Sequence, residues 1–153
     1  MKNYLLYTLI VLCMFACGSK SIYSDYQSVS SEMVWHKGQS VDFEFDLKPE
    51  EANAKLKLLF RHNVYFRYNN MPVQVVITCN KKKTPPTALP QVINIPVRDE
   101  SGLVTGSALG DIVDVEYLTD ITLPTAGKYN ISILPATTED VLDAMEIGIE
   151  VIP

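Results

Sequence analysis

The stretch Val41-Asp42-Phe43-Glu44-Phe45-Asp46-Leu47 decides the fold, because it alternates apolar and acidic residues without interruption. Successive side chains of a β-strand point to opposite faces, so this segment has one apolar face and one face that carries its carboxylates. Such a strand buries its apolar face and leaves the other in water. The segment therefore predicts a half-buried strand of an antiparallel sheet.

Several other segments repeat this alternation. Their apolar residues are Leu56, Leu58 and Phe60; Val73, Val75, Ile77 and Cys79; Ile93, Ile95 and Val97; Tyr129, Ile131 and Ile133; and Ile147, Ile149 and Val151. Asp111 to Leu123 is expected to form a longer strand or a bent pair. Pro90 and Pro96 bracket one strand, so its ends are expected to be irregular or to lie at a sheet edge. Turn signals rich in Gly, Pro, Asn and Asp separate these segments.

The whole pattern predicts an all-β fold. We expect a single antiparallel β-sandwich of seven to eight strands over residues 35–153, and a jelly roll is one topology that fits. Helix is scarce. One or two helical turns are expected from Thr138 to Met145, because Thr138 can cap the first turn and acids follow it.

The N-terminus has the pattern of a secretory signal peptide. Lys2 supplies a positive charge, and residues 4–16 form an uncharged apolar run. This run is too short to span a bilayer as a helix, which needs about 20 apolar residues. We therefore expect residues 1–16 to be removed as a signal peptide.

Cys17 is the predicted site of lipid attachment. Ala16 directly before it is the small residue that lipoprotein processing needs, since the thiol receives a diacylglycerol before the chain is cut in front of it. With acyl chains such as palmitate on Cys17, the protein would be held stably at a membrane. Residues 17–34 are predicted to form a Ser-rich tether whose aromatic residues dock on the domain. The alternative is an ordinary signal peptide without a lipid.

Charge and cysteine content limit the function classes. The chain carries 13 basic and 18 acidic side chains, a net charge of −5, and loss of Lys2 makes the secreted part more acidic. An acidic domain is a poor ligand for nucleic acid, so no nucleic-acid partner is expected. Cys79 would be the one cysteine left unmodified, so we expect a buried free thiol and no intramolecular disulfide.

The sequence contains no convincing catalytic or metal constellation. His36 and His62 are isolated from other ligand residues, and no Gly-x-Ser-x-Gly motif is present. We expect no enzyme activity, no cofactor, no metal and no small-molecule substrate. The carboxylates of Asp111, Asp114 and Glu116 could bind calcium, but a solvated strand face fits their spacing better.

An aromatic and basic segment stands where a turn is expected. Tyr65, Phe66, Arg67 and Tyr68 are candidate interaction residues, because Tyr and Arg are favoured anchors of protein interfaces. Two other interpretations remain open. The aromatic rings could cap the open end of the sandwich, or they could stack against a sugar.

A set of short motifs, in this order and behind the Cys17 motif, resembles a known family. The motifs are Tyr23 and Tyr26; Trp35-His36-Lys37 before the strand at 41–47; the stretch from Arg61 to Met71; Gly106 to Ile112; Gly127-Lys128-Tyr129; and Met145 to Val151. They are similar to those of the gliding-motility lipoprotein H (GldH) family of Gram-negative bacteria. Arg67 stands where the family usually has proline, and residues 136–138 also depart from the family pattern.

The resemblance implies an accessory lipoprotein of gliding, associated with the envelope machinery that also secretes adhesins, and without catalytic activity. Gly18 after the lipidated cysteine, in place of aspartate, favours the outer membrane, and the absence of acids directly after it favours the periplasmic side. Partners would be other gliding or secretion envelope proteins, and the membrane through Cys17. The alternative function is a β-sandwich lipoprotein that binds glycan or calcium.

Overall fold

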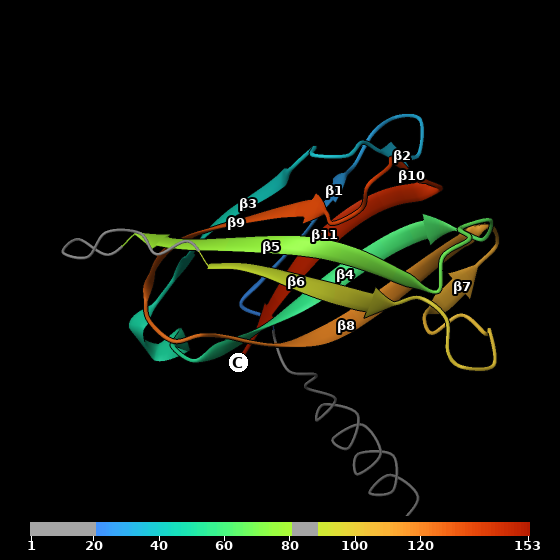
Figure 1. Cartoon of the computed structure of the whole chain (residues 1–153). Helices are drawn as coiled ribbons and strands as arrows, with labels where there is room; N and C mark the ends of the chain where they lie inside the picture. The colour runs from blue at the N-terminus through green and yellow to red at the C-terminus, as the bar shows by residue number, and fades with distance from the viewer. Residues whose placement is uncertain (1–20, 81–88) are drawn as a thin grey trace, which may run out of the picture.

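The computed structural model describes residues 21–80 and 89–153, which form two antiparallel β-sheets packed face to face (Figure 1). No α-helix occurs in these residues, and apart from one 3-10 turn at Pro49–Glu51 the regular structure is all strand. The strands are β1 (Tyr23–Ser28), β2 (Val34–Trp35), β3 (Val41–Leu47), β4 (Ala54–Asn63), β5 (Asn70–Asn80), β6 (Leu89–Pro96), β7 (Ser107–Leu109), β8 (Ile112–Leu123), β9 (Gly127–Pro135), β10 (Val141–Leu142) and β11 (Ala144–Ile152). The predicted antiparallel sandwich is confirmed, with 11 strands in place of seven to eight.

The two sheets draw on strands that are distant in sequence. The first sheet has the order β1-β11-β4-β8-β7, and the second has the order β3-β9-β5-β6. The short strands β2 and β10 form a separate two-stranded ribbon. In the described residues β6 pairs with β5 alone and lies at the edge of the second sheet, which is one of the two outcomes that its prolines predicted.

The core lies between the sheets and is made by the alternating residues that the sequence pattern singled out. In β3, Val41, Phe43, Phe45 and Leu47 are buried and the acidic residues between them are exposed. Leu58 of β4, Ile131 of β9 and Ile149 of β11 are completely buried. Since each buried aliphatic or aromatic side chain contributes about 1.5–3 kcal/mol, this core dominates the stability of the fold.

β1 belongs to the sandwich, so the predicted domain boundary at residue 35 is too late. All six β1 residues pair in register with β11, from Tyr23 opposite Val151 to Ser28 opposite Glu146. The ring of Tyr23 also stacks on Phe45 of the other sheet, with ring centroids 4.9 Å apart. The second half of the predicted tether is therefore an edge strand that closes one side of the core.

The predicted helix at 138–145 is wrong. Val141 and Leu142 form β10 and pair with Trp35 and Val34, and β11 begins at Ala144. The carboxylate of Asp140 accepts hydrogen bonds from the Lys37 backbone N–H at 2.8 Å and from His36 at 2.9 Å. Partners more than a hundred positions away in sequence thus hold this segment extended, against its local preference.

Two further findings concern the cysteine of β5 and the length of helices. Cys79 is a free thiol that is partly buried at the end of β5, where full burial was predicted. No helix in the described ranges is long and apolar enough to cross a bilayer.

Candidate functional site

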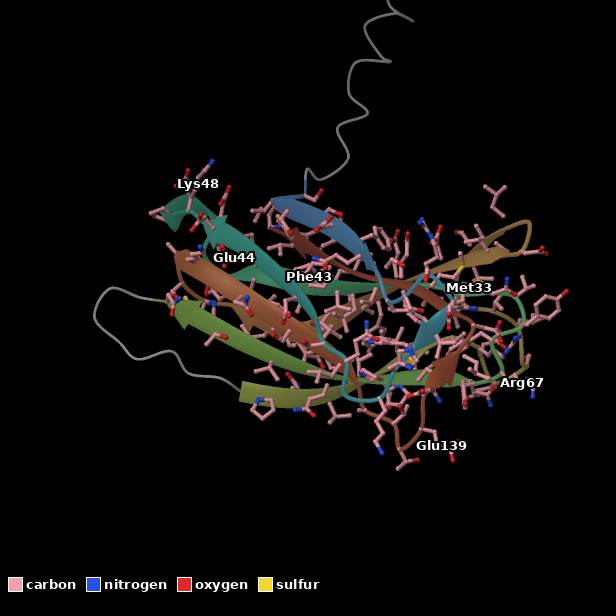
Figure 2. The ribbon with its side chains drawn as sticks, turned by 90° about the horizontal axis from the view of Figure 1, so that it is seen from above. Met33, Phe43, Glu44, Lys48, Arg67 and Glu139 are labelled. Atoms are coloured by element: carbon pink, nitrogen blue, oxygen red, sulfur yellow. The ribbon has the colours of Figure 1, made fainter. Side chains whose placement is uncertain are left out.

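The predicted interaction segment lies at one end of the sandwich, which we call the apical end. The turns that form it are residues 29–33, 64–69, 98–106, 110–111 and 136–143. Figure 2 shows Met33, Arg67 and Glu139 together at this end and Lys48 at the other. We call the opposite end, where Lys48 lies, the base. The chain enters β1 at the base, because Tyr23, the first residue of β1, pairs with Val151, and Val151 also pairs with Leu56 near the start of β4.

The four candidate interaction residues do not share one environment. Tyr65 is 71% exposed, Arg67 is exposed and Tyr68 is 48% exposed, but Phe66 is completely buried. The ring of Phe66 packs edge-on against Phe60, with centroids 5.3 Å apart, and so belongs to the core. Phe66 has no surface to offer a partner, and the turn presents three of the four side chains.

Hydrogen bonds from neighbouring residues hold this turn in one shape. The guanidinium of Arg98 donates to the carbonyls of Phe66 at 3.1 Å and Gly102 at 3.2 Å, and so ties two apical turns together. The side-chain oxygen of Asn63 accepts the backbone N–H of Tyr65 at 3.0 Å. Tyr65 and Arg67 therefore project from a braced turn, which reduces the entropy they would lose on binding.

His62 lies under this turn, completely buried against Phe60 and Phe66. Its Nδ1–H donates to the carbonyl of Asn63 at 2.7 Å, and its Nε2 has no hydrogen-bond partner in the described part of the chain. Burial lowers the pKa of His62, because the apolar surroundings penalise the charged ring. The ring therefore serves as a neutral packing group, and its position beneath Phe66 rules it out as an exposed general base.

Exposed apolar side chains gather at the apical end. Leu109 is 86% exposed and Leu103 is 66% exposed, and Tyr65 and Tyr68 are exposed at the same end. The other large apolar residues with exposed surface at this end are Met33, Ile112 and Leu142. Exposed apolar residues that collect on one face mark interaction surfaces, whereas single scattered ones carry no such meaning.

A cleft of about 540 Å³ opens beside Tyr68. Residues of β5 and β6 line one side of it, and the segment from Ala136 to Val141 lines the other. The lining is Tyr68, Asn69, Asn70, Met71, Pro72, Asn94, Ala136, Thr137, Thr138, Glu139, Asp140 and Val141. No sequence pattern predicts this cleft, because it joins segments that are remote along the chain.

His36 does not form a catalytic triad. Its Nδ1 contacts Asp140, whose pKa is lowered first by the hydrogen bond from the Lys37 backbone and then by His36 itself. In residues 21–80 and 89–153, no serine, threonine or cysteine contacts the other ring nitrogen of His36. The pair lacks the nucleophile that a triad requires.

Two of the acids considered as calcium ligands, Asp114 and Glu116, are engaged with cations on the outer face of the first sheet. Arg61 contacts Asp114 at 2.6 Å and Glu146 at 2.5 Å, and Lys57 contacts Glu116 at 3.0 Å. In the described ranges, no group of three or more His, Cys, Asp or Glu side chains is placed to hold a metal ion. The geometry gives the calcium alternative no support.

Comparison with known proteins classifies the chain. The profile of the family described as "GldH lipoprotein" matches residues 21–151. The chain belongs to the GldH lipoprotein family. The predicted resemblance is thereby confirmed, and the match runs from just before β1 almost to the end of β11.

Two relatives in the GldH lipoprotein family have names that state a process. The chain is 25% identical to the gliding motility lipoprotein GldH of Flavobacterium johnsoniae over 140 residues, which cover 90% of this chain and 83% of the relative. It is also 25% identical over 128 residues to a GldH homolog of Christiangramia forsetii, covering 82% and 75%. A CBM35 from Cellvibrio japonicus Abf62 is similar in structure, at a TM-score of 0.47 and 13% identity over 89% of this chain and 82% of that chain.

Cys17 lies outside the described residues, and the family match begins after it. Lipid attachment at this residue therefore stays a prediction for this member of the GldH lipoprotein family.

Proposed function

We propose that this protein is a non-catalytic envelope lipoprotein that supports gliding motility and the associated secretion machinery through protein–protein contacts at its apical end. Membership of the GldH lipoprotein family and the names of its relatives support the process. The exposed Tyr65 and Arg67 on a braced turn, with exposed leucines beside them, support the mode of action.

The position of Cys17, the proposed lipid anchor, supports an orientation in which the apical end points away from the membrane. Cys17 precedes Ile22 by five positions, so a lipid on it lies at most about 20 Å from the base of the sandwich. β4 has ten residues and spans about 30 Å from the base to the apical end. A domain anchored at the base therefore presents Tyr65 and Arg67 away from its membrane. We place the lipid in the outer membrane and the domain in the periplasm, as the residue after Cys17 favours.

The tip of the apical turn carries residue types that protein interfaces favour. Interfaces are enriched in Tyr and Arg at their centres. Tyr65 and Arg67 lie at the tip of the turn, and Leu103 on the turn joined to it by Arg98, with Leu109 at the end of β7, adds exposed apolar area. A folded envelope partner with an apolar patch fits this surface better than a small solute does.

The test is crosslinking in intact cells of a gliding strain, followed by mass spectrometry of the recovered partners. Tyr65→Ala combined with Arg67→Ala is expected to reduce partner recovery and colony spreading at unchanged protein level. Leu118→Ala is the matched control, because Leu118 is 51% exposed on the outer face of β8, away from the apical end. Full partner recovery from the folded double variant would refute the apical contact.

A further inference from the structure

The cleft beside Tyr68 is separate from the proposed protein contact. Tyr65, the most exposed residue of the apical turn, does not line it, whereas Tyr68 does. Its volume of about 540 Å³ lies within the range of about 300–1,000 Å³ that small-ligand sites occupy. Its chemistry can therefore be considered on its own.

The aromatic wall of the cleft is held in place. Tyr68 packs edge-on against the buried Phe66, with ring centroids 5.3 Å apart and planes at 65°. Tyr68 is 48% exposed and lines the cleft. A ring fixed at one edge and open on its surface is a platform on which a flat apolar face can stack without further ordering.

The polar groups around this platform are mainly uncharged. Asn69, Asn70, Asn94 and Thr138 offer amide and hydroxyl groups that both donate and accept hydrogen bonds. None of these four side chains has a hydrogen-bond partner elsewhere in residues 21–80 and 89–153, so each is available to a ligand. Hydroxyl groups of a ligand, which also donate and accept, complement such a surface.

The charges around this cleft disfavour anionic ligands. Among the described residues, no Lys or Arg lines it, and the carboxylates that do belong to Glu139 and Asp140. Asp140 is committed to His36 and to the Lys37 backbone, so Glu139 supplies the one carboxylate free to accept hydrogen bonds from a ligand. Phosphate, sulfate and uronic acids would meet repulsion here, whereas neutral hydroxyl groups would not.

We propose that this cleft binds a neutral saccharide, with one sugar ring stacked on Tyr68 and its hydroxyl groups held by Asn94, Asn70 and Thr138. The C–H face of a sugar ring supplies the apolar contact for the tyrosine, and the ring's rim of hydroxyl groups meets the amides. The saccharide occupies a position next to the protein contact. The two proposals rest on different side chains, so failure of this one would leave the proposed contact at Tyr65 and Arg67 untested by it.

The test is an NMR titration of the ¹⁵N-labelled protein, purified with its native N-terminus in a detergent that has no sugar headgroup. The probes are cellohexaose, chitohexaose, mannohexaose and a glucuronic acid oligomer. At least one neutral probe is expected to shift the amide signals of Asn69, Asn94 and Thr138, with a Kd of about 1 mM or tighter. The glucuronic acid oligomer is expected to bind at least about tenfold more weakly.

Variants separate a built site from a chance contact. Tyr68→Ala and Asn94→Ala, on different strands or turns, are each expected to weaken binding about tenfold or more. Tyr68→Phe keeps the stacking ring and is expected to stay within about threefold of the parent, and Tyr65→Ala is expected to match the parent. Trp35 fluorescence checks that each variant is folded, because Trp35 is completely buried.

Three results would overturn the proposal. One is the absence of binding by every neutral probe at about 10 mM. Another is binding that persists in both Tyr68→Ala and Asn94→Ala. The last is a lysine-containing peptide that occupies the cleft when no sugar does, which would assign the site to a cationic side chain held between Tyr68 and Glu139.

Discussion

Replacing His62 by phenylalanine probes how the apical turn is supported. The His62 ring is completely buried between Phe60 and Phe66, and its Nε2 lone pair has no partner in the described residues. Phenylalanine keeps an aromatic ring of similar size and removes this buried polar atom. The substitution also removes the hydrogen bond from Nδ1–H to the Asn63 carbonyl, but that carbonyl still accepts the Phe66 backbone N–H at 2.9 Å.

The expected change in stability follows from these two terms. A buried polar group without a partner costs about 1–3 kcal/mol, and the lost hydrogen bond contributed about 1 kcal/mol. His62→Phe is therefore expected to raise the free energy of unfolding by about 0–2 kcal/mol near pH 7.5. A surface histidine would give no such gain.

The pH dependence gives a sharper test. Burial is the main cause that lowers the folded-state pKa of His62 below the ordinary 6.5. The hydrogen bond to the Asn63 carbonyl opposes this lowering, Arg98 adds to it, and Asp114 and Asp143 oppose it. Below pH 6.5 His62 binds a proton in the unfolded chain, whereas in the folded chain it stays neutral until the pH reaches its lowered pKa. The parent protein should therefore lose up to about 1.4 kcal/mol per pH unit between 6.5 and the lowered pKa. His62→Phe should lack this loss.

Urea unfolding from pH 5 to pH 8, followed by Trp35 fluorescence, measures both effects. Trp35 is the one tryptophan in the chain and is completely buried, so its emission reports on the core. His36→Gln is the matched control: it removes the other histidine, which is exposed, and should keep the slope that His62 causes. If the advantage of His62→Phe did not grow as the pH falls, burial would not be what determines the proton affinity of this ring.

Three further substitutions test other parts of the structure. Gly148→Ala would place a Cβ 2.6 Å from the Asp25 carbonyl oxygen and push β1 away from β11, so a loss of about 1–3 kcal/mol in urea unfolding is expected, and parent-like stability would contradict this close contact. Arg61→Ala should lower the free energy of unfolding by about 1 kcal/mol, because two carboxylates lose their cation, and Arg61→Lys should lower it less. The loss in Arg61→Ala should shrink in 0.5 M NaCl, and a salt-independent loss would point to packing instead. Cys17→Ala should move the protein from the membrane to the soluble fraction of cells at unchanged unfolding midpoint, whereas a parent protein without acyl mass would refute lipidation.

Strong alternation in the sequence was enough to predict the central strands. The pattern of Val41–Leu47 predicts β3 directly, and the alternating run that ends at Val151 predicts β11. β1 was missed as a strand because its residues, Tyr-Ser-Asp-Tyr-Gln-Ser, alternate weakly. An edge strand has less surface to bury, and its pairing with β11 supplies what its own sequence lacks.

The site was predictable only where local chemistry sufficed. Tyr65 and Arg67 were found because aromatic and basic residues at a turn are unusual, and the structure exposes both. Phe66, between them, could not be told apart from its neighbours without the partner ring of Phe60. The cleft was invisible, because Asn94 and Glu139 meet Tyr68 only through the pairing of β5 with β6 and β9.

The pairing of β1 with β11 also determines how this domain would carry a mechanical load. A pull between an anchor at the base and a partner at the apical end runs parallel to β1. The hydrogen bonds between the two strands lie perpendicular to that direction, so they are loaded in shear. All six paired positions, and the flanking bonds at Ile22 and Val29, would have to yield together rather than one after another. The strand that follows the anchor is thus attached in the geometry that best resists being peeled away.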